Sequence, residues 1–185
     1  MKLVLICLLF AIPMVIRGQT TGATNNLWVS GGPGFFRNGP YAGLSFYGSL
    51  SWYRSNRVNT LNGVKSRNLF LKARGMLNFS GLDEDNYENF REYGVLYGKS
   101  FGKVGQFSIS AGIGIVEGLK TAGYNSPGTP RYGEKRFAGL GLPLECELNF
   151  VPAKVFGIGI IGFADINPKV TYYGFTINLL LGKIR

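Results

Sequence analysis

Two glutamates on one predicted strand have the spacing of a catalytic pair. Glu145 and Glu147 are two residues apart, and side chains at this spacing on a β-strand point to the same face. Two neighbouring carboxyl groups can serve as general acid and general base when their environments separate their protonation states. The pair therefore raises the hypothesis of an enzyme that works with carboxylates alone.

The sequence contains no histidine, which limits that hypothesis. Outer-membrane barrel enzymes that deacylate or acylate lipid A, hydrolyse phospholipids or cleave peptides use histidine as a base or to activate a nucleophile or water. Those mechanisms are excluded here. Only a histidine-free enzyme acting on lipid or glycan stays open.

Three more charged residues fall on the same side of their predicted strands as the glutamates. In the barrel that the strand pattern predicts, this side is the inner face. Lys72 and Arg74 lie on one strand and Glu92 on the next. An unpaired charge in a narrow lumen is costly, whereas ion pairs with satisfied hydrogen bonds are tolerated. We therefore predict a structural ionic network of Lys72, Arg74, Glu92, Glu145 and Glu147, and no catalytic, cofactor-binding or metal-binding residue.

The strands that position these charges are visible as alternation of apolar with small or polar residues. Eight segments alternate in this way: residues 27–36, 41–54, 68–79, 92–101, 106–117, 137–149, a seventh from residue 156, and 172–185. The seventh pattern blurs at Ile161 and Phe163. Strict alternation over short, regularly spaced segments is typical of half-buried antiparallel strands. The fold predicted is all-β, an antiparallel up-and-down transmembrane β-barrel of eight strands.

Alternation alone does not say which face is outside, because a soluble lipocalin-like barrel hides its apolar face. The second face here consists mostly of Gly, Ser, Thr and Asn, whereas about a quarter to a third of a soluble exterior is charged. This composition favours lipid outside and a filled lumen inside. It places Cys146 on the lipid face. Four aromatic residues near strand ends are predicted to form interfacial girdles: Trp28, Trp52, Tyr172 and Tyr173.

The first residues predict export. Lys2 precedes an apolar run that is too short for a membrane helix, so residues 1–18 read as a signal peptide that is removed, with cleavage as late as Ala23 still open. Residues 19–185 then form the barrel. Loss of Lys2 and Arg17 lowers the formal charge from +10 to +8.

The connections predict both chain ends in the periplasm. Asn62-Gly63 is a strong hairpin signal, and a turn there pairs Trp52 with Ala73 and Phe46 with Phe79, unless residues 55–67 form a longer loop. The long connections, residues 80–90 and 119–136, fall on the extracellular side.

Two of these connections carry charge, and one glycine-rich segment lies in the first strand. The acidic loop holds Asp83, Glu84 and Asp85 without the glycine and spacing of a calcium loop. The second loop is basic and suits solvent, lipid phosphates or an acidic glycan rather than nucleic acid; its cations are Lys120, Arg131, Lys135 and Arg136. Residues 31–34 (GGPG) resemble a phosphate loop only in glycine content, so we expect them to let the first strand bend or pack closely.

Five segments carry a resemblance to a known family: YGVLYGKSF at 93–101, SAGIG at 110–114, GLPLE at 141–145, GIGIIGFADINP at 157–168 and LGKIR at 181–185. They resemble a family of small, largely uncharacterised outer-membrane β-barrels of Bacteroidota, which are eight-stranded barrels like those of OmpA and OmpX. The resemblance covers residues 27–185. It implies architecture and an outer-membrane location, and it transfers no functional residue.

Taken together, the sequence predicts a non-enzymatic integral outer-membrane barrel of a Gram-negative cell, with a membrane-structural or surface-binding role through its extracellular loops. Its expected partners are outer-membrane lipids, lipopolysaccharide and the barrel-assembly machinery. A narrow channel, a histidine-free enzyme and a soluble barrel are the alternatives.

Overall fold

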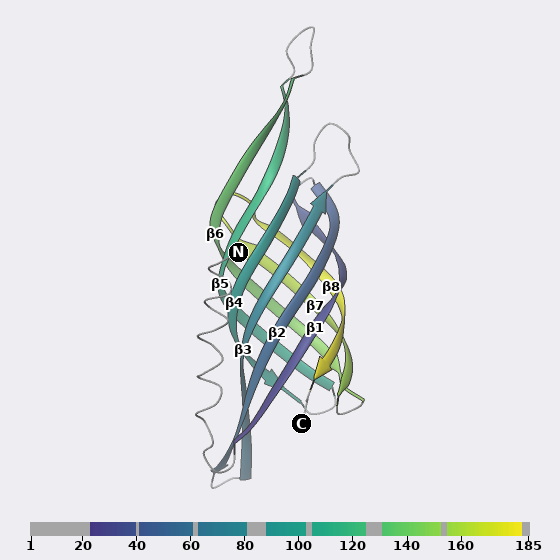
Figure 1. The fold of residues 1–185 in the computed structure, drawn as a ribbon. Coiled ribbons are helices and arrows are strands. Elements are labelled where there is room, and N and C mark those ends of the chain that lie inside the picture. The colour runs from purple at the N-terminus through teal and green to yellow at the C-terminus, as the bar shows by residue number, and fades with distance from the viewer. Residues whose placement is uncertain are drawn as a thin grey trace.

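The computed structural model describes residues 23–39, 41–60, 63–80, 88–102, 105–124, 131–152 and 155–182. These residues form eight strands in one closed sheet, in which the order along the chain is also the order around the barrel (Figure 1). The strands are β1 (Ala23–Asn38), β2 (Tyr41–Thr60), β3 (Gly63–Ser80), β4 (Glu88–Phe101), β5 (Gly105–Tyr124), β6 (Arg131–Phe150), β7 (Phe156–Ile166) and β8 (Tyr172–Gly182).

Every strand pairs antiparallel with its neighbours, and β1 pairs with β8 to close the sheet. This confirms the predicted up-and-down barrel of eight strands. The predicted signal peptide, residues 1–18, lies outside the described residues. Within the described ranges, no helix is long and apolar enough to cross a membrane.

The two ends of the barrel differ in their connections. We call the end with the connections 81–87 and 125–130 the upper end, as it is drawn in Figure 1. At the lower end β1 begins and β8 finishes, and the connections are 61–62, 102–104 and 151–155. Gly102 has φ +88° in one of these turns, a backbone conformation that favours glycine.

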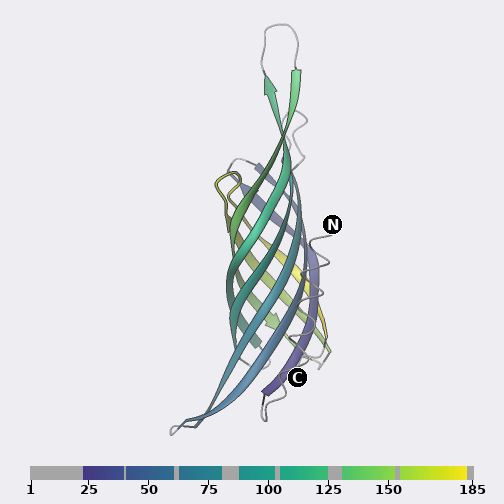
Figure 2. The same cartoon turned by 60° about the vertical axis from the view of Figure 1, so that its left-hand side comes forward.

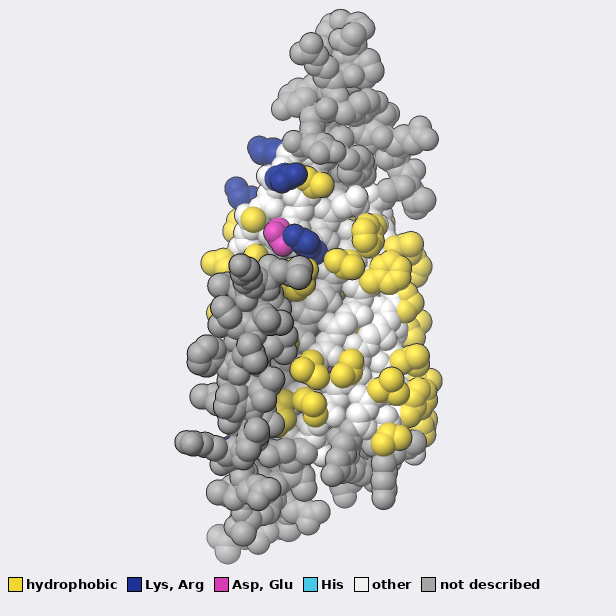
Figure 3. Space-filling view, in the orientation of Figure 1, with side chains coloured by type: hydrophobic (Ala, Val, Ile, Leu, Met, Phe, Trp, Pro, Cys, Tyr) yellow, Lys and Arg dark blue, Asp and Glu magenta, His cyan; other side chains and the backbone are white. Residues whose placement is uncertain are grey.

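The alternation of the sequence is reproduced in the exposure of the side chains. Outward residues such as Ile113 and Leu140 are 67% and 69% exposed, whereas inward Ser45 and Thr176 are completely buried. Hydrophobic side chains therefore cover much of the outer wall (Figure 3). Cys146 is exposed on this wall, as predicted.

The predicted register of β2 and β3 is wrong by two residues. Thr60 pairs with Gly63, so that Trp52 faces Leu71 and Phe46 faces Leu77. The turn is thus centred on residues 61–62 rather than on Asn62-Gly63. A shift of two residues keeps every side chain on its predicted face, because the side-chain period of a strand is two.

Two hairpins are longer than the sequence predicted. Residues 55–60 and 63–67 continue β2 and β3 instead of forming a loop, and most of the expected loop 119–136 belongs to β5 and β6. The β5–β6 hairpin rises beyond the other strands at the upper end, and the β2–β3 hairpin extends at the lower end (Figures 1 and 2). These extensions are rich in polar residues and lack the alternation of apolar and polar residues, so the sequence pattern did not predict them as strands.

Residues 31–34 form the tightest part of the closing seam. A Cβ atom at Gly32 would overlap the carbonyl oxygen of Ile177 on β8, and one at Gly34 would overlap that of Phe175. Glycine lets the two backbones approach here. The predicted close packing of this segment is confirmed.

Candidate functional site

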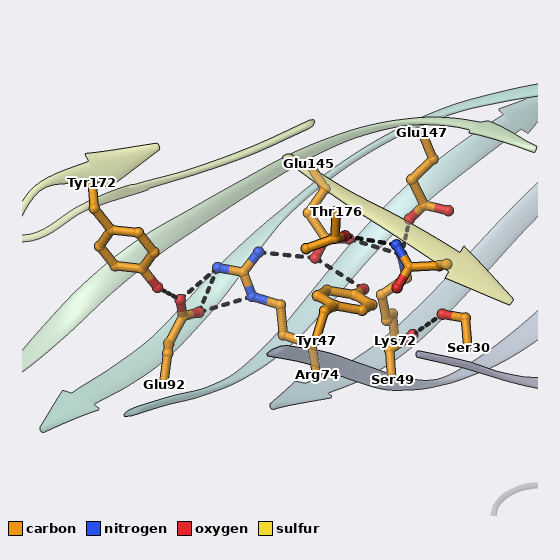
Figure 4. Close-up of polar contacts among 11 residues, drawn as sticks. Ser30, Tyr47, Ser49, Lys72, Arg74, Glu92, Glu145, Glu147, Tyr172 and Thr176 are labelled. Atoms are coloured by element: carbon orange, nitrogen blue, oxygen red, sulfur yellow. Dashed lines mark hydrogen bonds and ion pairs between the residues drawn. The ribbon is translucent and has the colours of Figure 1, made fainter. Parts of the chain in front are cut away.

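The five predicted charges meet inside the barrel (Figure 4). Lys72 and Arg74 come from β3 and Glu92 from β4, while Glu145 and Glu147 come from β6. β6 is separated from β3 by two strands, so the contacts between them cross the lumen. The side chains in these ion pairs are between 0% and 4% exposed.

Arg74 is the centre of the network. Its Nε and Nη2 donate to Glu92 Oε1 at 2.9 and 2.6 Å, and Nη2 also lies 2.6 Å from Glu92 Oε2. Its Nη1 donates to Glu145 Oε1 at 2.8 Å. The planar guanidinium thus holds one carboxylate on each side, an arrangement that a lysine could not reproduce.

Lys72 bridges the two glutamates of β6. Its Nζ lies 2.8 Å from Glu145 Oε2, and it forms a second ion pair with Glu147. The Asn149 amide donates to Glu147 Oε2 at 3.1 Å. The Tyr47 hydroxyl donates to Glu145 Oε1 at 3.1 Å. Each glutamate therefore has a cation and a neutral donor as partners.

Glu92 is also bound by Tyr172, which the sequence analysis predicted to lie in an interfacial girdle. The Tyr172 hydroxyl donates to Glu92, and Tyr172 is completely buried. Glycines make room for this carboxylate, since Cβ atoms at Gly94 and Gly114 would lie 3.2 and 3.0 Å from Glu92 Oε1. The small residues of the inner face thus serve to accommodate the few large charged ones.

Hydrophobic side chains fill the lumen on both sides of the network. The upper cluster contains Phe36, Tyr47, Met76, Phe90, Val116, Ile161, Phe163, Val170 and Tyr172. The lower cluster contains Trp28, Tyr53, Phe70, Val151 and Leu180. In the lower cluster the Tyr53 ring lies 4.5 Å from that of Trp28 and 4.7 Å from that of Phe70; such aromatic pairs contribute about 0.5–1.5 kcal/mol each beyond their burial.

These clusters correct the predicted aromatic girdles. Trp28 is 5% exposed and Tyr172 is completely buried, so neither lies at a lipid interface. Both have the inward parity of their strands, beside Ser30 and Thr176 respectively. Tyr173 does lie on the outer wall, 55% exposed. The parity of an aromatic residue on its strand therefore predicts whether it faces outward better than its closeness to a strand end does.

Asp165 is a buried charge that the sequence analysis missed. It is completely buried on β7, and neither carboxylate oxygen has a hydrogen-bond partner among the described residues. Its parity matches Ile161 and Phe163, which point into the lumen. The seventh strand therefore alternates normally between its two faces. The pattern looked blurred because Ile161 and Phe163 on its inner face are apolar, like the residues on its outer face. With Asp165, the described side chains buried in the lumen include four carboxylates and two cations.

The arrangement offers little for catalysis. Glu145 and Glu147 already face cations, and the hydrophobic clusters lie between them and either end of the barrel. In the part of the chain that the structure describes, no group of three or more carboxylate or cysteine side chains is placed to hold a metal ion. The geometry fits an internal structural network better than a substrate site.

The charged connections are described only in part. The acidic residues Asp83, Glu84 and Asp85 lie outside the described residues, and so do the side chains of Arg131 and its neighbours. Lys135 and Arg136 are exposed at the upper end. Lys120 lies over the Tyr41 ring, with Nζ 5.5 Å from the ring centre.

Comparison with known proteins adds the fold and nothing finer. No protein-family model and no curated protein matches the sequence. Neisserial surface protein A matches with a TM-score of 0.56 and 8% identity, over 86% of this chain and 98% of its own. The N-terminal β-barrel domain of Pseudomonas aeruginosa OprF matches with a TM-score of 0.53 and 12% identity, over 86% and 98%.

A third solved structure is Ail, the attachment invasion locus protein of Yersinia pestis, in complex with the heparin analogue sucrose octasulfate. It matches with a TM-score of 0.57 and 11% identity, over 88% of this chain and 99% of its own. Identities this low carry no functional residue, and the resemblance to the Bacteroidota family stays a prediction. The chain is an eight-stranded antiparallel barrel with the fold of outer-membrane β-barrel proteins.

Proposed function

We propose that this chain is an integral barrel of the outer membrane of a Gram-negative cell. Its outer wall carries many half-exposed large apolar side chains, among them Leu140, Leu148 and Ile113 at 61% to 69% exposure. A water-soluble monomer rarely exposes a continuous apolar surface of this kind. Inserted in a bilayer, the same surface contacts lipid, and the closed sheet leaves no unpaired edge.

The barrel acts without catalysis, as a membrane-structural or surface-binding protein. The observation that carries this proposal is the filled lumen, in which hydrophobic clusters enclose the paired charges of the network. Glu145 and Glu147 are buried and already paired with Lys72 and Arg74, and the sequence has no histidine to take a catalytic role in their place.

The contact surface is at the upper end, which we place outside the cell, with both chain ends in the periplasm and insertion by the barrel-assembly machinery. Lys135 and Arg136 are exposed there, and a cationic rim attracts anionic partners. The structure of Ail with a sulfated sugar shows that a barrel of this fold can hold a polyanion. An anionic component of the cell surface is therefore the partner class that we propose.

A narrow channel is the second candidate, and conductance separates it from a closed barrel. The purified barrel, inserted in a planar bilayer, is expected to give no single-channel steps, because large side chains such as Tyr53, Phe70 and Phe90 lie within the lumen. A porin added to the same bilayer controls for detection. Reproducible steps from the barrel itself would contradict the proposed closed lumen.

A further inference from the structure

A hollow of about 630 Å³ lies on the upper part of the outer wall, across β3, β4, β5 and β6. Most of its lining residues have outward parity, and they include Leu77, Phe79, Arg91, Glu117 and Arg136. Its volume is in the range of small-ligand sites in proteins, about 300–1,000 Å³. We therefore place the hollow on the outer wall, although four lining residues, Asn78, Phe90, Gly118 and Phe137, have inward parity.

Leu77 and Phe79 supply an apolar side of this hollow on β3, where Leu77 pairs with Arg91 and Phe79 with Asn89. Leu77 and Phe79 are 45% and 46% exposed. Phe79 also packs against Phe46 on the same wall, with ring centres 6.2 Å apart. These residues continue the apolar wall that we assign to contact with hydrocarbon chains.

The charged side chains that line the hollow come from the other three strands, β4, β5 and β6. Arg91 Nε lies 2.7 Å from Glu117 Oε1, and both side chains are about half exposed. Arg136 faces Leu119, two residues beyond Glu117 on β5, so it is a diagonal neighbour of Glu117 at roughly 7–8 Å. Arg136 has no ion pair or hydrogen bond to any other described residue, and the three charges sum to +1.

In Figure 3, basic and acidic side chains gather toward the upper end of the face, above a field of hydrophobic ones. A lipid in the upper leaflet has the same order, with its charged headgroup above its acyl chains. Arginine binds phosphate through several parallel N–H donors, while Glu117 and Asn89 offer acceptors to sugar hydroxyls.

We propose that the hollow holds one phosphorylated glycolipid of the outer leaflet. An acyl chain lies along Leu77 and Phe79, a phosphate contacts Arg136 and Arg91, and sugar hydroxyls contact Glu117. The proposal rests on the proposed outer-membrane location, since that leaflet is where such a lipid meets the upper end of the barrel. It makes this part of the wall a defined binding site within the general lipid contact.

Native mass spectrometry of the folded barrel in detergent tests the proposal with diphosphoryl lipid A as the probe. The barrel is expected to retain one lipid A molecule, and Arg136→Gln to weaken this binding about tenfold, as for the loss of one charge-assisted contact. Arg37→Gln is the matched control, because Arg37 is an exposed residue near the upper end of β1, away from the hollow. It should leave the binding unchanged.

Two comparison lipids identify the source of the contact. Lipid A without phosphates and phosphatidylglycerol should both bind at least tenfold more weakly. Equal binding of dephosphorylated lipid A, or unchanged binding by Arg136→Gln, would overturn the phosphate site. Equal binding of phosphatidylglycerol would overturn the choice of a glycolipid. A heat-dependent gel shift shows that each variant is folded, so failure to bind is distinct from failure of the proposed membrane barrel.

Discussion

Replacing Arg74 by methionine is expected to lower the free energy of unfolding of the barrel by about 3–5 kcal/mol, the usual effect of breaking a buried ion pair on one side. The substitution leaves the carboxylates of Glu92 and Glu145 buried without their shared cation. Urea titration of the barrel in detergent micelles measures the loss. The fluorescence of Trp28, which is buried in the lower cluster, reports unfolding.

Double variants distinguish the network from simple loss of packing. Arg74→Met combined with Glu145→Gln should cost less than Arg74→Met alone, because one orphaned charge is removed as well. Adding Glu92→Gln instead should recover more, since Glu92 receives three of the four hydrogen bonds that Arg74 donates to described residues. Strictly additive losses would contradict the network.

An exposed ion pair supplies the control for the same titration. Arg91→Gln removes the partner of Glu117 on the outer wall, where both side chains are about half exposed. Exposed pairs contribute little to stability. Arg91→Gln is therefore expected to leave the urea midpoint nearly unchanged.

Replacing Gly32 by alanine is expected to destabilise the folded barrel by about 3 kcal/mol or more, at the upper end of the range for overpacked sites. The new methyl group would overlap the backbone carbonyl of Ile177, and a backbone atom moves only if the β1–β8 seam opens. The fraction of chain that shows a heat-dependent gel shift after refolding measures the effect.

Gly48→Ala is the matched control for this substitution. Gly48 lies on β2, and a Cβ atom there would meet no other atom within 4 Å. Alanine also restricts the unfolded chain more than glycine does. Equal yields of folded barrel from Gly32→Ala and Gly48→Ala would show that the seam tolerates a wider spacing than the structure has.

The fold was predictable because one physical rule acts on every strand. In the proposed membrane setting, lipid outside and a narrow lumen inside force opposite chemistry on alternate residues, so parity alone assigned residues such as Lys72, Glu92 and Cys146 to their faces. The ionic network followed from the same rule. Charges on the inner face of a narrow barrel are expected to pair with one another, and the structure joins all five through ion pairs.

The inner face is less uniform than the prediction assumed. Ile161, Phe163 and Trp28 fill the lumen with apolar bulk, so an apolar residue on the inner parity looked like a break in the pattern or an interfacial anchor. Asp165 was overlooked for the same reason, because the strand around it was read as blurred. An apolar side chain is stable both in a filled lumen and on the outer wall, so residue type alone does not tell an inward apolar residue from an outward one.

Register and strand length depended on information that alternation does not contain. Any even shift of β3 against β2 preserves both faces, so the choice between Leu71 and Ala73 as the partner of Trp52 lies in the turn. The extensions of β5 and β6 continue beyond the apolar band of the outer wall. In these extensions polar residues no longer alternate with apolar ones. Backbone pairing continues there without a pattern in the side chains.

The environment of Cys146 tests the central assignment most directly. In a Cys7→Ser variant reconstituted in liposomes, a nitroxide attached to Cys146 reports whether the outer wall meets hydrocarbon or water. Lys169→Cys, made in a chain whose own cysteines are replaced by serine, is the control, because Lys169 is exposed in the upper connection between β7 and β8. We expect the Cys146 label to be relaxed more by oxygen than by a water-soluble nickel chelate, and the Lys169→Cys label to show the reverse. Stronger relaxation of the Cys146 label by the nickel chelate would contradict a lipid-facing outer wall.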